Sequence, residues 1–160
     1  MRGLNRFACL GAALVTLAAL GTAGCSEQGP RNSAGEVTAS VPTDAFSLQV
    51  GDCTAPLTTG TVGELTLVPC AEPHAWEAFA TTDLEGDEFP GAGKVQDQAE
   101  EFCNHQFKAF VGVSVSTSRY DLTILQPTKQ TWTHGDDRQV TCLVGDGKGK
   151  VEGSLRGIEK

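Results

Sequence analysis

The chain has 160 residues, with 12 Lys and Arg against 20 Asp and Glu, a formal net charge of -8, 39% hydrophobic residues and six cysteines. This length favours a single domain and argues against a two-domain enzyme built around a large cofactor fold. The acidic balance argues against a nucleic-acid-binding protein, since neutralising phosphates takes clustered Lys and Arg, and a single long apolar run excludes a polytopic membrane protein.

Residues 1–24 have the pattern of an export signal. Arg2 and Arg6 give a positively charged start, and the apolar run Phe7–Leu20 follows. At about 14 residues, this run has the length of a secretory hydrophobic region and is shorter than the ~20 residues of a membrane-spanning helix. We therefore expect residues 1–24 to be a signal peptide.

The end of this signal resembles the lipobox of bacterial lipoproteins. Ala23 and Gly24 precede Cys25, and Thr22 stands where leucine is usual. The resemblance implies cleavage between Gly24 and Cys25, acylation of Cys25 and anchoring in the cell membrane on its extracytoplasmic face. The alternative is an ordinary secreted protein with an incidental cysteine.

Two segments flank the expected domain. Residues 25–44 are rich in Ser, Gly, Pro, Thr and Ala, which predicts a lipidated N-terminus followed by a flexible linker. Cleavage would remove two basic side chains and no acidic one, leaving 10 basic and 20 acidic side chains. Such a charge is repelled by anionic headgroups, so we expect the folded body to stand off the membrane. The Gly-rich residues 145–160 predict a loose tail with a possible short strand near Val151, which leaves 45–144 as the domain.

Within residues 45–144, periodicity predicts one helix among several strands. Apolar residues alternate with polar ones in five segments, which are 46–50, 64–68, 76–81, 120–124 and 138–144. Val95, Ala99, Cys103 and Phe110 follow helical spacing, and Gly112 is a suitable stop. The order predicts an α+β fold, with a mainly antiparallel sheet packed against one principal helix.

Four cysteines remain after the expected cleavage, and export favours two disulfides among them. Three pairings are possible, of which we favour Cys53–Cys70 and Cys103–Cys142. The first two residues follow neighbouring strands, and the other two lie on the buried faces of the helix and the last strand. A zinc site is the competing interpretation, but the sequence has neither CxxC nor HxxxH spacing. We expect no metal and no cofactor.

Candidate catalytic residues are few. His74 and Glu77 could serve as a general acid–base pair, although three positions along an extended segment place them on opposite faces. A structural histidine is the alternative. Trp132 could stack on a sugar but is also typical of core or rim packing. His105 and His134 are expected at the surface, and the acidic loop Asp83–Glu88 in solvent.

Several motifs together resemble one family. In order, they are Phe46-x-Leu48-x-Val50-Gly51-Asp52-Cys53, Val68-Pro69-Cys70-x-x-Pro73-His74-x-x-Glu77, Cys103-x-x-x-Phe107, Pro127-Thr128 with Trp132, and Gly135-Asp136-Asp137-Arg138-x-Val140-x-Cys142. This set resembles the septum formation domain family of exported, membrane-attached proteins, mostly actinobacterial. The last motif of the family usually begins Gly-Asp-Arg, whereas this chain has two Asp residues, Asp136 and Asp137, between Gly135 and Arg138.

The resemblance implies a link to cell division or the envelope and names no reaction. We therefore expect a non-enzymatic module that binds an envelope protein, a divisome protein or a wall component. The alternative is a wall-acting hydrolase or metal-dependent enzyme centred on His74 and Glu77. An exposed apolar patch would favour binding, and a pocket joining His74 to a second titratable group would favour catalysis. Arg138 is expected to pair with Asp52 or Glu77.

Overall fold

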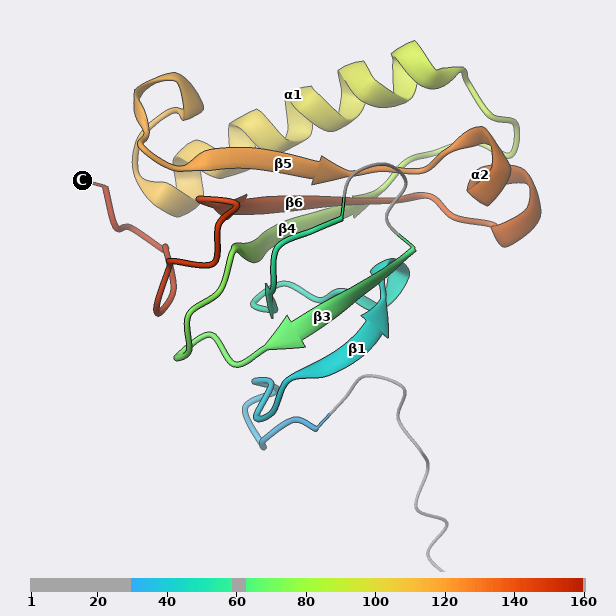
Figure 1. Cartoon of the computed structure of the whole chain (residues 1–160). Coiled ribbons are helices and arrows are strands. Elements are labelled where there is room, and N and C mark those ends of the chain that lie inside the picture. Colours follow the sequence, from blue (N-terminus) through green and yellow to red (C-terminus); the bar gives the residue numbers. More distant parts are fainter. Residues whose placement is uncertain (1–29, 59–62, 160) are drawn as a thin grey trace, which may run out of the picture.

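The computed structural model describes residues 30–58 and 63–159. The predicted signal peptide and Cys25 lie outside the described residues. Six strands form one sheet in the order β1-β3-β2-β4-β6-β5, and every neighbouring pair is antiparallel (Figure 1). The strands are β1 Val41–Asp44, β2 Cys53–Thr54, β3 Glu64–Val68, β4 Trp76–Asp83, β5 Asp121–Leu125 and β6 Gln139–Gly145.

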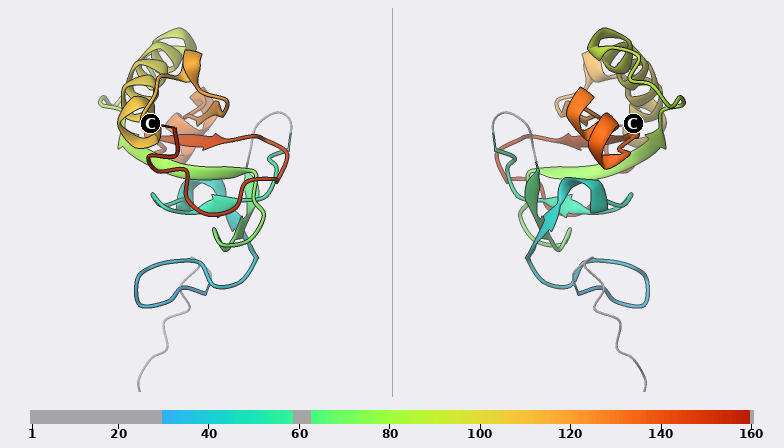
Figure 2. Two further views of the ribbon diagram at one scale, coloured as in Figure 1. Left: turned by 90° about the vertical axis from the view of Figure 1, so that its left-hand side faces the viewer. Right: turned by 90° about the vertical axis from the view of Figure 1, so that its right-hand side faces the viewer.

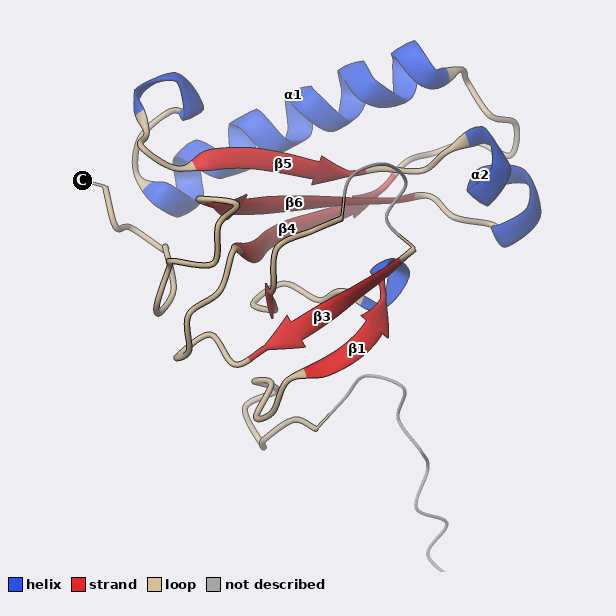
Figure 3. Cartoon of the chain, in the orientation of Figure 1, coloured by secondary structure: helices blue, strands red, loops and turns tan. Residues whose placement is uncertain are grey.

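One helix dominates the remainder of the fold (Figure 3). The helical elements are η1 Ala45–Ser47, α1 Ala92–Val111, η2 Val115–Thr117 and α2 Lys129–Gly135. Gly112 caps α1 in the left-handed conformation and donates its N–H to the Lys108 carbonyl, so the predicted helix stop is confirmed. The predicted α+β fold with one principal helix and two disulfides is likewise confirmed.

Helix α1 packs on one face of the sheet and forms the larger core. Its buried residues are Val95, Ala99, Cys103, Phe107, Phe110 and Val111. They meet Val140, Cys142 and Val144, which alternate along β6 and point to the same face. Phe107 is also fully buried, although it was not among the residues that helical spacing assigned to the buried face. The pattern therefore indicated the right face of the helix with one large residue missing.

The opposite face of the sheet covers a second core. Leu143 points away from α1 and packs with Trp76 and Ala78 of β4, and with Leu65 and Leu67 of β3. Strand β4 contributes to both cores because successive strand residues point to opposite faces, with Trp76 and Ala78 in the second core and Phe79 in the larger one. Its pairing with β6 also shifts register between Ala78 and Ala80. Figure 1 shows β1 and β3 at an angle to the other strands, so the sheet curls around this second core.

The predicted strand over residues 46–50 is wrong. Asp44 accepts hydrogen bonds from the Phe46 N–H at 2.9 Å and the Ser47 hydroxyl at 2.6 Å, which closes the 3-10 turn η1. The strand comes earlier, at β1, within the segment expected to be a linker. Local turn chemistry at an Asp therefore overrides a short apolar–polar alternation, and the folded unit begins before residue 45.

The C-terminal segment is folded against the domain, contrary to the loose tail expected for residues 145–160. Val151 forms an isolated antiparallel β-bridge with His74, at the place where a short strand was expected. Leu155 is only 2% exposed in the larger core, and the Gly157 N–H donates to the Phe110 carbonyl at the end of α1. Isolated apolar side chains in a Gly-rich segment can order it when each one enters a core.

Helix α2 has no counterpart among the elements expected from the sequence. Thr128 caps its start by accepting from the Thr131 N–H, and the Thr131 hydroxyl accepts from the Thr128 N–H. Threonine serves at both positions of this reciprocal cap, where Glu or Gln is usual at the second. Because Thr131 stands where Glu or Gln is usual, the sequence lacks the common pattern of a capped helix start.

Gly145 tests the packing of β6 on β4. A Cβ at this position would overlap the carbonyl oxygen of Ala75 and lie 2.8 Å from its carbonyl carbon. Because both neighbours are backbone atoms, Gly145→Ala should lower the free energy of unfolding by about 3 kcal/mol, measured by urea denaturation of the oxidised protein.

The matched control is Gly93→Ala, since a Cβ there meets nothing within 4 Å and Gly93 lies inside α1. Alanine should stabilise that helix by up to about 1 kcal/mol. Equal stabilities for the two variants would show that β4 and β6 do not pack as described.

Candidate functional site

The two expected disulfides are both present. Cys53 is bonded to Cys70 across a separation of 17 residues, and Cys103 to Cys142 across 39 residues. The first holds the start of β2 to the turn after β3, and the second holds α1 to β6. All four predicted cysteines therefore have structural roles.

His74 is a buried structural residue. Its side chain is 1% exposed, and its Nδ1 lies 2.9 Å from the Glu72 carbonyl oxygen. Because a carbonyl can only accept, Nδ1 carries a proton. Nε2 is buried and has no hydrogen-bond partner among the described residues. The ring is thus held in one orientation beside the Val151 bridge.

Glu77 fastens the C-terminal segment. Its carboxylate accepts from the Ser154 hydroxyl at 2.6 Å and from the Leu155 N–H at 2.7 Å, and its side chain is 4% exposed. Both oxygens are engaged in a structural contact. Within the described part of the chain, no hydrogen bond joins Glu77 to His74, so the structure does not assemble the proposed acid–base pair.

Arg138 and Trp132 form a second structural cluster. The guanidinium carbon of Arg138 lies 4.0 Å from the centroid of the Trp132 ring. Arg138 donates to the carbonyls of Gly86 and Trp132, both at 3.1 Å, and Trp132 donates its indole N–H to the Asp87 carbonyl. At 2% exposed, Trp132 packs in the core and cannot present its face to a sugar.

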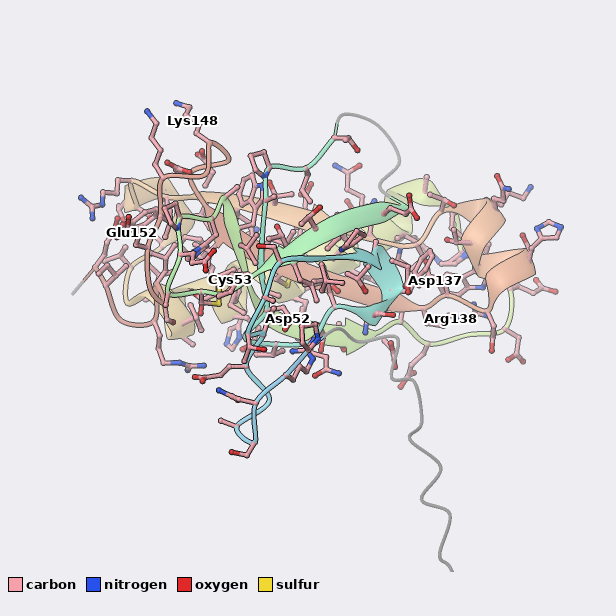
Figure 4. All side chains as sticks on the ribbon, turned by 60° about the horizontal axis from the view of Figure 1, so that its bottom comes forward. Asp52, Cys53, Asp137, Arg138, Lys148 and Glu152 are labelled. Atoms are coloured by element: carbon pink, nitrogen blue, oxygen red, sulfur yellow. A yellow bond between two sulfur atoms is a disulfide. The ribbon has the colours of Figure 1, made fainter. Side chains whose placement is uncertain are left out.

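The expected partners of Arg138 are therefore wrong. Its ion pair is with Asp136 at 3.2 Å, and Figure 4 shows Asp52 well separated from Arg138. Asp52 instead pairs with Arg31, from the segment predicted to be a linker. The hydrogen bond from Arg31 to Asp52 raises the pKa of Arg31 above its ordinary value. Nothing local in the sequence signals this long-range contact.

Two surface hollows lie among the described residues. The smaller, of about 390 Å³, lies beside Glu77 and is bounded by Val37, Cys70 and Arg156. The larger, of about 590 Å³, is bounded by η1, the end of β5 and the start of β6. We call the larger hollow the β5 groove.

The β5 groove joins apolar walls to a polar rim. Its apolar residues are Ala45, Phe46, Ile124 and Leu125, and Phe46 is 51% exposed. Phe46 is one of only three large apolar side chains that are exposed among the described residues, together with Val50 and Ile158. An exposed Phe above a concave apolar surface is a typical feature of a binding site.

The charge around the β5 groove is acidic. Asp137 lines it, while Asp44 and Glu64 adjoin the lining residues Ala45 and Gly63 and are both exposed. No Lys or Arg occurs among the described residues that line the groove. The exposed Lys129 adjoins the lining residue Thr128 in the same way, so acidic side chains outnumber exposed basic ones around the apolar walls.

In the described ranges 30–58 and 63–159, no group of three or more His, Cys, Asp or Glu is arranged to hold a metal ion. In the same ranges, no helix is both long and apolar enough to cross a membrane.

Two disulfides, a curled antiparallel sheet and one covering helix define a small disulfide-stabilised α+β domain. The sequence profile of the family described as "Septum formation" matches residues 50–157, and the chain belongs to this family. The match includes most of the C-terminal segment, in keeping with its packing against Glu77 and α1.

Two mycobacterial proteins are similar to this chain. Both carry the name "Putative lipoprotein LppN", one from Mycobacterium tuberculosis (strain ATCC 25618 / H37Rv) and one from Mycobacterium bovis (strain ATCC BAA-935 / AF2122/97). Each is 31% identical over 116 residues, which cover 69% of this chain and 63% of the relative. This chain thus matches somewhat less than two thirds of each relative's length. No solved structure matches.

Arg138 offers a test of the Trp132 cluster. Arg138→Ala removes the stacking and the bonds to the carbonyls of Gly86 and Trp132, and should lower the free energy of unfolding by about 2 kcal/mol. Arg138→Lys should recover less than half of the loss, since an ammonium cannot reproduce the planar fork. Urea denaturation measures both variants.

Arg119→Ala is the matched control. Arg119 also lies over an aromatic ring, that of Tyr120 at 4.9 Å, and pairs with Glu159, but its side chain is 72% exposed. Its removal should cost at most about 0.5 kcal/mol. Similar losses at positions 119 and 138 would contradict a bracing role for Arg138.

Proposed function

We propose that this protein is a lipid-anchored, extracytoplasmic module of the cell envelope that binds a protein partner in processes linked to septum formation. The lipobox-like residues ending at Cys25, the family and the lipoprotein name of the mycobacterial relatives support the anchor and the location. The two disulfides support an oxidising compartment.

The observation that carries the binding role is the half-exposed Phe46 beside the β5 groove. Burying an aromatic side chain at an interface contributes about 1.5–3 kcal/mol. Phe46 is still half exposed, so a partner that covers the rest of its side chain would gain part of this free energy. Ile124 and Leu125 supply the opposite wall for an inserted side chain.

The charge of the rim indicates the kind of partner. Asp137, Asp44 and Glu64 favour a segment whose apolar residues are flanked by Lys or Arg. A second copy of this chain is a poor occupant, because it carries the same excess of acidic residues. We infer an extended, basic and apolar segment of another extracytoplasmic protein.

The same structure favours a non-enzymatic role over the hydrolase alternative. Hydrolysis centred on His74 and Glu77 would need both groups to reach one water or substrate. Their side chains are 1% and 4% exposed, and the polar atoms that have partners bind the Glu72 carbonyl and the 154–155 segment. Neither residue lines the β5 groove.

The test uses two short acetylated peptides with the same leucine pair, one flanked by lysines and the other by glutamates. Titration is followed by NMR on the oxidised protein. The lysine peptide should shift resonances of the groove residues and bind about tenfold more tightly, a difference of about 1.4 kcal/mol. Phe46→Ser should weaken that binding about tenfold.

Ile158→Ser is the matched control, because Ile158 is 47% exposed against 51% for Phe46 and lies outside the groove. It should leave binding unchanged. Absent binding, equal binding of both peptides, or shifts confined to residues outside the β5 groove would each contradict the proposed binding site.

A further inference from the structure

We infer that the acylated protein holds its N-terminal face against the outer surface of the bilayer, with α1 directed away from it. This inference rests on the proposed acylation of Cys25. It concerns residues 30–38, which we call the strap, and the pair that fixes the strap to the domain. The partner is the headgroup layer of the membrane that carries the anchor.

The strap has its own backbone structure. Arg31 and Val37 form an antiparallel bridge, and the Thr38 N–H donates to the Pro30 carbonyl at 2.9 Å. Asn32 closes the turn between them by accepting from the N–H groups of Ala34 and Glu36. Val37 is 7% exposed in the second core, so the strap is anchored by an apolar contact as well.

A two-pronged ion pair fastens the strap to the sheet. Arg31 Nη1 lies 2.6 Å from Asp52 Oδ1, and Arg31 Nη2 lies 2.9 Å from Asp52 Oδ2. Asp52 is 2% exposed, accepts a further hydrogen bond from the Gln49 N–H, and precedes the disulfide-bonded Cys53. Bidentate, charge-assisted contacts of this kind are stronger than neutral hydrogen bonds. The strap is therefore held at a fixed place on the domain.

Chain length then limits how far the domain can lie from its anchor. Cys25 precedes Arg31 by six positions, and six residues reach at most about 20 Å even when fully extended. A folded unit of this size has a radius of gyration of about 14 Å, so its diameter exceeds that reach. The anchored domain cannot turn its far end to the membrane while the strap remains bound.

The arrangement of the elements shows which face of the domain then points away from the bilayer. In Figures 1 and 2, the strap lies at one end and α1 at the opposite end, with the sheet between them. The strap contributes one acidic side chain, Glu36, and the basic Arg31. The strap therefore carries no net charge, and Glu27 is the one acidic residue between it and Cys25, so this face can approach the headgroups although the net charge of the whole chain favours a body that stands off the membrane.

The experiment uses the full-length acylated protein in phosphatidylcholine vesicles that carry an energy-transfer acceptor on their headgroups. A fluorescent amino acid replaces Ser33 in the strap or Gln98 on α1, both exposed. Transfer from position 33 should exceed transfer from position 98 about threefold, because the tether is short. Arg31→Gln combined with Asp52→Asn frees the strap, so the chain between Cys25 and β1 can extend and α1 can approach the bilayer. Transfer from position 98 should therefore rise, while transfer from position 33 stays high because Ser33 lies eight residues from Cys25, and the double variant leaves no buried charge unpaired.

Arg119→Gln, which breaks an ion pair with Glu159 outside the strap, is the control and should preserve the difference. Near-ultraviolet circular dichroism verifies that each variant is folded. Equal transfer from both positions in wild-type protein that floats with the vesicles would overturn the inference alone. Wild-type protein that does not float would overturn the proposed anchor and this inference with it.

Discussion

The Cys103–Cys142 disulfide joins the buried face of α1 to β6, which lies between β4 and β5 in the sheet. Closing loops of 39 and 17 residues, this bond and Cys53–Cys70 contribute about 4 and 3 kcal/mol respectively in the chain-entropy account. Small domains have about 5–15 kcal/mol of stability in total, so the fold depends on oxidation. Because β6 supplies residues to both cores, fixing it to α1 also fixes the sheet from which the second core is built.

The surface features follow from that framework. Curling of the sheet around the second core brings η1 opposite the end of β5, and the β5 groove lies between them. The buried acids serve to attach the chain ends, since Asp52 binds Arg31 of the strap and Glu77 binds the 154–155 segment. His74 and Glu77, which resembled a catalytic pair in the sequence, thus hold the C-terminal segment, while the half-exposed Phe46 carries the proposed binding role.

Sequence reasoning succeeded where a feature is encoded locally. The strand at 64–68 and the helix ending before Gly112 follow from periodicity, and so does the Cys103–Cys142 pair, from the faces that periodicity assigned. The Cys53–Cys70 pair is also correct, although it was favoured partly from a strand over 46–50 that the structure does not contain. Sequence reasoning failed where distant residues decide the outcome. The strap is ordered by Asp52, and the C-terminal segment by Glu77 and the larger core, and neither contact leaves a periodic signal. The site was missed for the same reason, because Phe46 and Leu125 belong to distant elements.

The central claim is that this domain is exported and folds around two specific disulfides. The most direct measurement is peptide mapping by mass spectrometry of the protein isolated from its native membranes, with thiols blocked and without reduction. The account predicts that Cys53 is linked to Cys70 and Cys103 to Cys142, with no free thiol at any of the four positions. Free thiols at these positions, or crossed pairs such as Cys53 with Cys103, would contradict it.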